Sequence, residues 1–120
     1  MAKKNFLFVM RREPHGGIFV QEALDIILTI AAFDQRVSLL FLDDGVYQLK
    51  KGQSPAGAGL KDVAPIFGAL PIYDVQAFYA EEESLIERGL NTNQLILPVI
   101  LISRAEVPLL LQRHDVILNG

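Results

Sequence analysis

Apolar runs separated by polar breaks dominate the pattern of hydrophobic and polar positions along the chain. The runs are continuous and not alternating, which is typical of strands covered on both faces. Strands are therefore expected at residues 5–10, 37–42, 72–80, 95–102 and 115–118.

Helices are expected between these strands. Residues 18–33 hold twelve apolar residues among sixteen, with no Pro or Gly, and are too long for a strand. Shorter helices are expected at residues 46–50, 60–70, 81–88 and 103–113, and the one at 81–88, which contains Ser84, is expected to be a polar helix on the surface. Gly89 stands where a left-handed C-cap is expected, and Pro108 is expected to disturb the second turn of the last helix.

Strands that alternate with helices predict the fold class α/β, as a single three-layer α/β/α sandwich with a mostly parallel five-stranded sheet. The 120 residues leave room for one domain, over residues 1–120. In such folds ligands and partners bind at the carboxyl ends of the strands. Those ends are expected at residues 11–17, 43–45 and 80–83.

The composition excludes several functions. Eleven Lys and Arg against fourteen Asp and Glu give a net charge of -3, which predicts no direct binding of nucleic acid or anionic lipid. No cleavage site and no spanning segment are visible, so a cytoplasmic protein without membrane contact is expected. Cysteine is absent, so this chain cannot carry a persulfide, a thiolate metal site or a disulfide.

The apolar content predicts a surface that partners cover. Hydrophobic residues make up 51% of the chain and charged residues 21%. On the long helix of residues 18–33 the polar residues form one narrow stripe, so much of its surface needs cover. Ile18 and Ala32 flank that stripe and are interface candidates. The aromatic residues are expected to pack in the core, namely Phe33, Phe67, Tyr73, Phe78 and Tyr79.

The first loop offers a phosphate-binding alternative. Arg11, Arg12 and His15 precede Gly16 and Gly17 at the start of a helix, which is a geometry that can hold phosphate. The loop lacks the G-x-G-x-x-G spacing and the Lys-Ser/Thr of known phosphate loops, which favours a simple turn. A small phosphate- or nucleotide-binding protein remains an alternative.

No catalytic residue, metal ligand or cofactor site is expected. Asp43 and Asp44 could hold a metal ion. They are better interpreted as turn and helix-cap residues, because no further metal-ligating residue is obvious nearby in the sequence. Gly45 follows them at a strand exit, where a positive φ is expected. A hydrolase would need a nucleophile elbow, which is missing, and the pair His114-Asp115 is interpreted as a turn.

Short motifs in a fixed order carry a resemblance to a known family. They are P-H-G at 14–16, L-x-D-G-V-x-Q-L at 42–49, G-Q at 52–53, Y-D at 73–74, S-L-x-E-R-G-L at 84–90 and D-V-I-L at 115–118. Together they resemble the DsrE/DsrF-like family, and within it the TusC branch of bacterial sulfur-relay subunits. The loop candidates His15, Gly16, Asp44, Gly45 and Gln48 belong to these motifs.

The resemblance implies a subunit without catalytic residues or cofactor. Its partners would be TusB-like and TusD-like subunits in a dimer of heterotrimers, with TusE reached through the complex. The relay cysteine would lie on the TusD-like chain, and the persulfide sulfur would serve 2-thiouridine formation at the tRNA wobble position. A DsrF-type subunit of a sulfur-oxidation complex is the alternative within the family.

Overall fold

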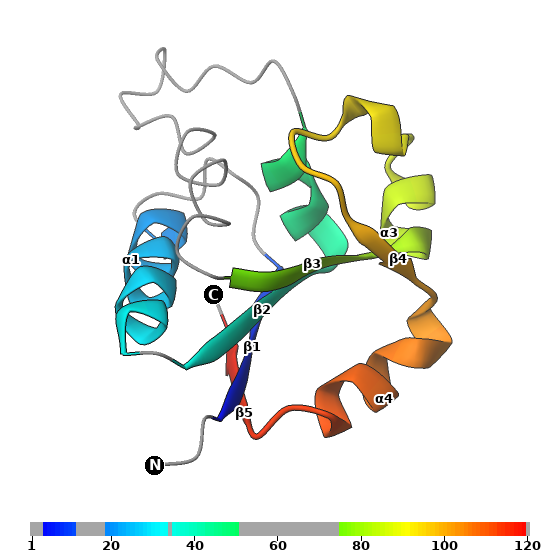
Figure 1. Ribbon diagram of the computed structural model, residues 1–120. Helices are drawn as coiled ribbons and strands as arrows, with labels where there is room; N and C mark the ends of the chain where they lie inside the picture. Colours follow the sequence, from blue (N-terminus) through cyan, green and yellow to red (C-terminus); the bar gives the residue numbers. More distant parts are fainter. Residues whose placement is uncertain (1–3, 12–18, 34, 51–74, 120) are drawn as a thin grey trace.

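Five parallel strands form the centre of the molecule (Figure 1). A computed structural model describes residues 4–11, 19–33, 35–50 and 75–119. The strands are β1 (Asn5–Met10), β2 (Arg36–Phe41), β3 (Val75–Glu81), β4 (Ile100–Ile102) and β5 (Val116–Asn119). Their order is β4-β3-β2-β1-β5, and every neighbouring pair is parallel. The expected five-stranded sheet is confirmed.

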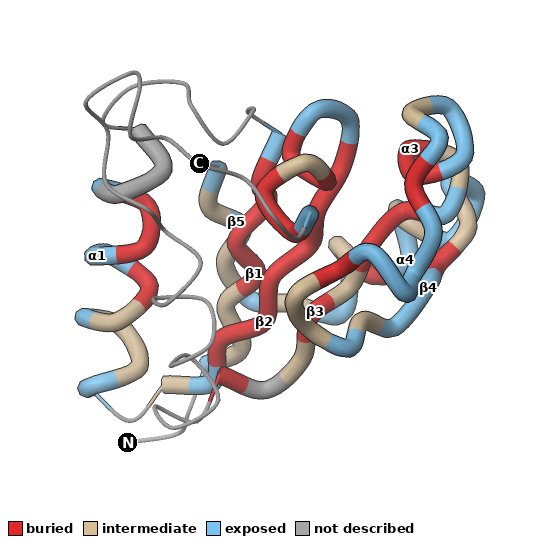
Figure 2. The backbone as a smooth tube through the Cα atoms, turned by 90° about the horizontal axis from the view of Figure 1, so that it is seen from above, coloured by how far each residue is buried: buried red, intermediate tan, exposed pale blue. Residues whose placement is uncertain are grey.

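Helices cover both faces of the sheet, so the fold has three layers. The helical elements are α1 (Phe19–Ala32), α3 (Glu82–Glu87), α4 (Val107–Gln112) and the 3-10 helices at Asp43–Leu49, Thr92–Gln94 and Arg104–Glu106. Figure 2 shows α1 on one side of the strands and α4 on the other. The helix expected at 60–70, the loop at 51–59 and the strand residues 72–74 lie outside the described residues.

The pleat of the strands divides the core into two clusters. On the α1 face, Phe8, Leu39 and Phe41 pack with Leu24 and Ile27 of the helix. On the α4 face, the alternate residues Leu7, Val9 and Leu40 of the same strands pack with Ile102 of β4 and with Leu110. Both faces of β1 and β2 are thus buried, which is why these strands read as continuous apolar runs.

The fourth strand is shorter than expected. It spans three residues, Ile100–Ile102, in place of residues 95–102. Leu95 instead forms an antiparallel bridge with Lys50, and the Ile96 amide donates to the Leu49 carbonyl at 2.7 Å. Pro98 has no N–H to offer to a sheet, so the chain joins β3 only after it.

The expected disturbance of the last helix by Pro108 is wrong. The capping box at Ser103 opens a 3-10 turn, and α4 begins at Val107. Pro108 therefore lies in the first turn of α4, where an amide has no intrahelical acceptor and a fixed φ suits the helix.

Some apolar side chains on the surface depart from the expected packing. Phe33 was expected in the core but is 74% exposed just after α1, and Ile26 on the same helix is 47% exposed. Phe78 is buried and Tyr79 is half-buried, as expected, whereas Phe67 and Tyr73 lie outside the described residues. Among the described helices, none is long and apolar enough to cross a membrane.

Candidate functional site

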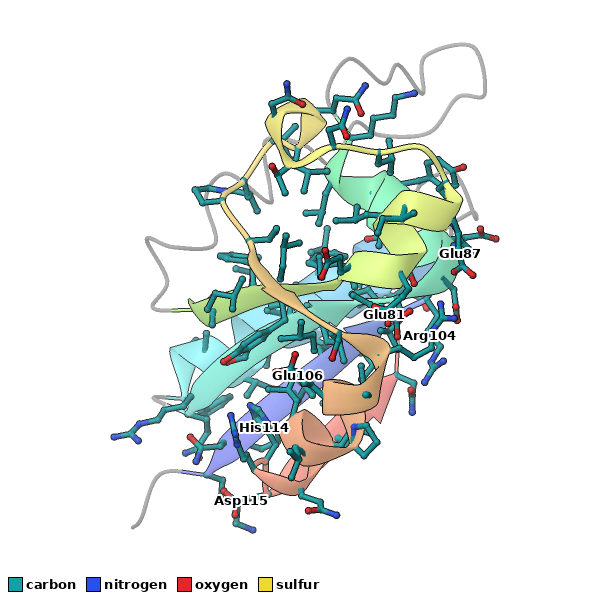
Figure 3. All side chains as sticks on the ribbon, turned by 90° about the vertical axis from the view of Figure 1, so that its right-hand side faces the viewer. Glu81, Glu87, Arg104, Glu106, His114 and Asp115 are labelled. Atoms are coloured by element: carbon teal, nitrogen blue, oxygen red, sulfur yellow. The ribbon has the colours of Figure 1, made fainter. Side chains whose placement is uncertain are left out.

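A network of charged and hydroxyl side chains lies at the carboxyl ends of the strands, where this fold class places its sites. Its members follow β1, β2, β3 and β4 directly, so the parallel topology brings them to one edge of the sheet. Figure 3 shows Glu81, Glu87 and Arg104 grouped at this edge. We call this group the carboxyl-edge network; its residues are Arg11, Asp43, Asp44, Glu81, Glu83, Ser84, Glu87, Arg88 and Arg104.

Asp43 connects the ends of three strands. Its backbone N–H donates to the Ser84 hydroxyl at 2.9 Å, and its carboxylate lies 3.4 Å from the Arg11 guanidinium. Asp43 has a φ of 51°, a left-handed conformation that Asp adopts more readily than most residues. The residue thus serves the turn, as the sequence predicted.

Gly45 is required for a different reason from the one expected. A positive φ was expected there, but in this turn the positive φ belongs to Asp43. A Cβ on Gly45 would lie 1.9 Å from the carbonyl oxygen of Met10. The glycine therefore allows the backbone after β2 to pass directly against the end of β1.

Glu81 is a buried carboxylate at the end of β3. The sequence suggested a surface helix at 81–88, but Glu81 is the last strand residue, and it is 4% exposed. Its Oε1 atom accepts from the Ser84 hydroxyl at 2.6 Å and from the Arg104 guanidinium at 2.9 and 3.1 Å. These donors satisfy a charge that burial would otherwise disfavour. Ser84, which was expected on a helix surface, is fully buried.

Arg104 links β4 to the end of β3 and to α3. Its guanidinium donates to Glu81 and, at 2.7 Å, to Glu87, and its backbone N–H donates to both carboxylate oxygens of Glu83 at 2.9 and 3.0 Å. Hydrogen bonds to Glu81 and Glu87 raise the pKa of Arg104. The hydrogen bond from Arg104 lowers the pKa of Glu87, with a smaller contribution from the charge of Arg88.

Arg88 ties α3 to the turn after β2. Its Nε atom donates to Asp44 at 3.1 Å, and a second nitrogen donates to the Ser84 carbonyl at 3.2 Å. Gly89 follows with a φ of 66°, which confirms the expected left-handed cap.

The network is suited to holding the edge rigid rather than to chemistry. Arg11, Arg88 and Arg104 each face a carboxylate, and the Ser84 hydroxyl is buried between two hydrogen bonds. Within the part of the chain that the structure describes, no cluster of three His, Cys, Asp or Glu residues could hold a metal ion. Asp43 and Asp44 bind arginines, in keeping with their interpretation as turn residues.

The remaining predicted residues that the structure describes lie on other parts of the fold. Gln48 is buried in the 3-10 helix after β2, and Ala32 is exposed at the end of α1. His15, Gly16 and Ile18 lie outside the described residues.

His114 and Asp115 lie at the opposite end of the sheet, as Figure 3 shows. The Asp115 carboxylate accepts from the Asn5 amide at 2.7 Å, and its own amide donates to the Asn5 carbonyl at 2.8 Å. His114 Nδ1 lies 2.7 Å from the Leu110 carbonyl oxygen. These contacts are those of a turn that enters β5.

Sequence reasoning missed Glu81, Ser84 and Arg104. A partial signal exists, because Glu81 ends an apolar run and Ser84 follows three residues later, in a hydrogen-bonding position of the next turn. Arg104 stands 23 residues from Glu81, and only the pairing of β3 with β4 brings the two together.

Comparisons with known proteins agree over most of the chain. The model of the DsrE/DsrF-like family matches residues 4–119. The chain is 41% identical over 116 residues to the "Protein TusC homolog" of Pseudomonas aeruginosa, which covers 97% of this chain and 98% of that protein. It is 45% identical over 93 residues to the "Intracellular sulfur oxidation protein DsrF" of Allochromatium vinosum, which covers 78% of this chain and 68% of that protein.

A solved structure shares the fold. The crystal structure of the ychN protein from E. coli superposes with a TM-score of 0.82, at 18% identity, over 98% of this chain and 99% of that chain. At this identity the likeness concerns the fold alone.

Proposed function

Because the chain belongs to the DsrE/DsrF-like family, we propose that it is a sulfur-relay subunit that holds a sulfur-carrying partner and carries no sulfur itself. The observation that carries the proposal is the nearly end-to-end similarity to proteins named TusC, at 41% and 37% identity. The sequence has no cysteine, so a persulfide in the relay must form on another chain.

The structure supports a scaffold role in two ways. The carboxyl-edge network locks the ends of four strands with buried and charge-assisted hydrogen bonds, which gives a partner a fixed surface to bind. The exposed side chains of Ile26 and Phe33 on and after α1 offer apolar area that a partner would remove from water.

The finer proposal follows the TusC relatives. The partners are TusB-like and TusD-like subunits in a dimer of heterotrimers, and TusE is reached through the complex. The relay cysteine lies on the TusD-like chain, and the sulfur serves 2-thiouridine formation at the tRNA wobble position in the cytoplasm. No cofactor and no direct tRNA contact are needed on this chain.

A DsrF-type role is the second candidate. The 45% identity to the DsrF protein of Allochromatium vinosum favours it, although that match spans a smaller share of both chains. The two candidates differ in the partners they require, because one complex delivers sulfur to RNA and the other serves sulfur oxidation.

The test is purification of the tagged chain from its native host, with mass spectrometry of what it retains. The proposal expects related subunits of the same family, one of them with a persulfide-forming cysteine. Labelled cysteine and a cysteine desulfurase should then add sulfur to that partner and leave the mass of this chain unchanged. Covalent, reductant-labile sulfur on this chain, or the absence of family partners, would contradict the proposal.

Binding of a small ligand distinguishes the sulfur-relay proposal from the remaining alternative, a phosphate- or nucleotide-binding protein. If the loop at 11–17 binds phosphate, then phosphate or a nucleotide should raise the melting temperature of the chain alone. The sulfur-relay proposal expects such stabilisation from partner chains and none from these ligands.

A further inference from the structure

Helix α3 exposes one large apolar side chain at the carboxyl edge of the sheet. The helix packs on β3 and on the 3-10 helix at Asp43–Leu49, and its residues Ser84 and Leu85 are buried. Ile86, by contrast, is 68% exposed. Gly89 follows three positions later, and a Cβ there would meet nothing within 4 Å, so the space beside this end of the helix is open. The outer face of α3 is therefore unpartnered.

Carboxylates flank Ile86 on this helix. Glu82 and Glu83 precede it by four and three positions, which places them on the same side of α3, and Glu87 follows it directly. Glu82 is exposed and forms none of the hydrogen bonds or ion pairs found in the described part of the chain. The Glu87 side chain is 51% exposed although it pairs with Arg104. The outer face of α3 thus has an apolar centre and an acidic rim.

The surplus of negative charge in the described ranges is concentrated at this edge. The carboxyl-edge network together with Glu82 holds six carboxylates and three guanidinium groups, whereas the other charged residues of these ranges balance, with four carboxylates against four bases. Arg88 is only 20% exposed, and Arg104 already donates to two carboxylates. These bases neutralise their own neighbours, so an approaching molecule meets an edge that is net negative.

Ion pairs and hydrogen bonds hold the acidic rim in place. The Arg104 guanidinium donates to Glu87 at 2.7 Å, and its backbone N–H donates to both oxygens of Glu83 at 2.9 and 3.0 Å. Arg88 connects α3 to Asp44 at 3.1 Å. A surface that is already ordered loses little conformational freedom when a partner binds.

We propose that the outer face of α3 is a docking surface for a protein that presents an apolar pocket rimmed by lysine and arginine side chains. Ile86 enters the pocket, and Glu82 and Glu87 face the bases of its rim. An apolar anchor at the centre of a polar rim is the arrangement from which small interfaces draw most of their binding energy. A nucleic acid or an anionic lipid does not fit, because the net negative edge repels phosphate.

This docking surface is separate from the α1 face that family subunits are proposed to contact. Figures 1 and 2 show α1 and α3 on opposite sides of the molecule. One chain can therefore hold a subunit through α1 while a second protein binds at α3. A small contact with a charged rim favours rapid association and a short-lived complex. The inference does not rest on the proposed function, because it requires neither a persulfide nor a family partner.

Site-specific photo-crosslinking identifies the occupant. The photoreactive amino acid p-benzoylphenylalanine replaces Ile86 in one full-length chain and Ile26 of α1 in another, and both chains are irradiated in the native host. Position 86 should link to one protein, at a site flanked by Lys or Arg, which position 26 does not reach. No link from position 86, or links only to nucleic acid, to sites without bases or to the subunit that position 26 reaches, would overturn the inference.

Charge reversal then tests recognition with the purified protein that position 86 identifies. Ile86→Ser and Glu82→Lys should each raise its Kd by about tenfold, the second chiefly through slower association. Reversal of a base at the crosslinked site to Glu should restore the binding of Glu82→Lys. Asp25→Lys is the matched control, because Asp25 is exposed on α1 and its reversal changes the net charge equally. An unchanged Kd for Glu82→Lys, an equal loss for Asp25→Lys or a failed restoration would contradict the docking surface.

Folding and the proposed function are controlled separately. Ile86 and Glu82 are exposed, so circular dichroism and melting of each variant should match the wild type; Glu82→Gln supplies a milder variant, which should raise the Kd by a smaller factor. Links from position 26 to a related subunit would support the proposed function even if position 86 reached nothing. Links from position 86 alone would leave the docking surface standing without it.

Discussion

The backbone N–H of Asp43 donates a hydrogen bond of 2.9 Å to the hydroxyl of Ser84, 41 residues further along the chain. The same hydroxyl donates to the buried carboxylate of Glu81 at 2.6 Å. One buried side chain thus joins the turn after β2 to the end of β3. The arrangement fixes the edge of the sheet at which partners of this fold class bind.

Ser84→Ala should destabilise the chain by about 1 to 3 kcal/mol, because it removes one buried and one partly buried hydrogen bond and leaves Glu81 with one donor fewer. Urea unfolding followed by circular dichroism measures the change. Thr29→Ala is the control, since the Thr29 hydroxyl donates to the Asp25 carbonyl on an exposed helix face. Equal losses in the two variants would show that the buried network contributes little.

Gly45→Ala should cost more stability than Gly89→Ala. A Cβ at Gly45 would meet the Met10 carbonyl at 1.9 Å, so the end of β1 or the turn must move, at about 1 to 3 kcal/mol or more. Gly89 has open space around a Cβ and a φ of 66°, so alanine costs about 1 kcal/mol there. The same urea experiment compares them, and the reverse order would contradict the close approach.

The sequence predicts the sheet well because a strand that is buried on both faces appears in the sequence as a continuous apolar run. Runs such as residues 6–10 are apolar throughout, and the sixteen residues from Ile18 exceed the length of a strand. Gly45 is a position whose contacts the local sequence does not predict. Its position in a turn is visible in sequence, but the carbonyl it must avoid belongs to β1, 35 residues earlier by numbering, and only the fold brings the two together.

The site was predictable only in outline. The three expected strand ends do meet at one edge, as a parallel sheet requires. The partners of Glu81 were not predictable, because an acid after a strand looks the same whether it is solvated or buried against Arg104. Such pairing depends on strand order, which the sequence pattern alone leaves open.

Stability at acidic pH should depend on Glu87. The hydrogen bond from Arg104 holds the pKa of Glu87 below its ordinary value of 4.5 in the folded chain. The folded state therefore binds this proton less readily than the unfolded state, and the stabilisation is present above 4.5 and lost as the pH falls through the folded pKa.

Glu87→Gln removes this ionisation, so its free energy of unfolding should fall less than that of the wild type between about pH 6 and about pH 3. Urea unfolding at a series of pH values measures both slopes. Glu82→Gln is a suitable control, because Glu82 is exposed on the same helix and forms no described ion pair. Parallel slopes for the wild type and Glu87→Gln would show that the pair with Arg104 is not maintained in solution.

Helix α1 is expected to contact a partner subunit as well as the sheet. Ala23, Leu24 and Ile27 are buried against the strands, whereas Ile26 is 47% exposed and Ala32 is exposed. Ile26→Glu and Ala32→Glu should therefore leave the unfolding of the chain nearly unchanged while reducing its recovery in a complex with co-expressed family partners, measured by size-exclusion chromatography with light scattering. Thr29→Glu, on the polar stripe, tests whether added charge alone has this effect. If Ile26→Glu and Ala32→Glu assemble as fully as Thr29→Glu, the exposed apolar face of α1 is solvent-facing, and the interface with partners must lie on another element.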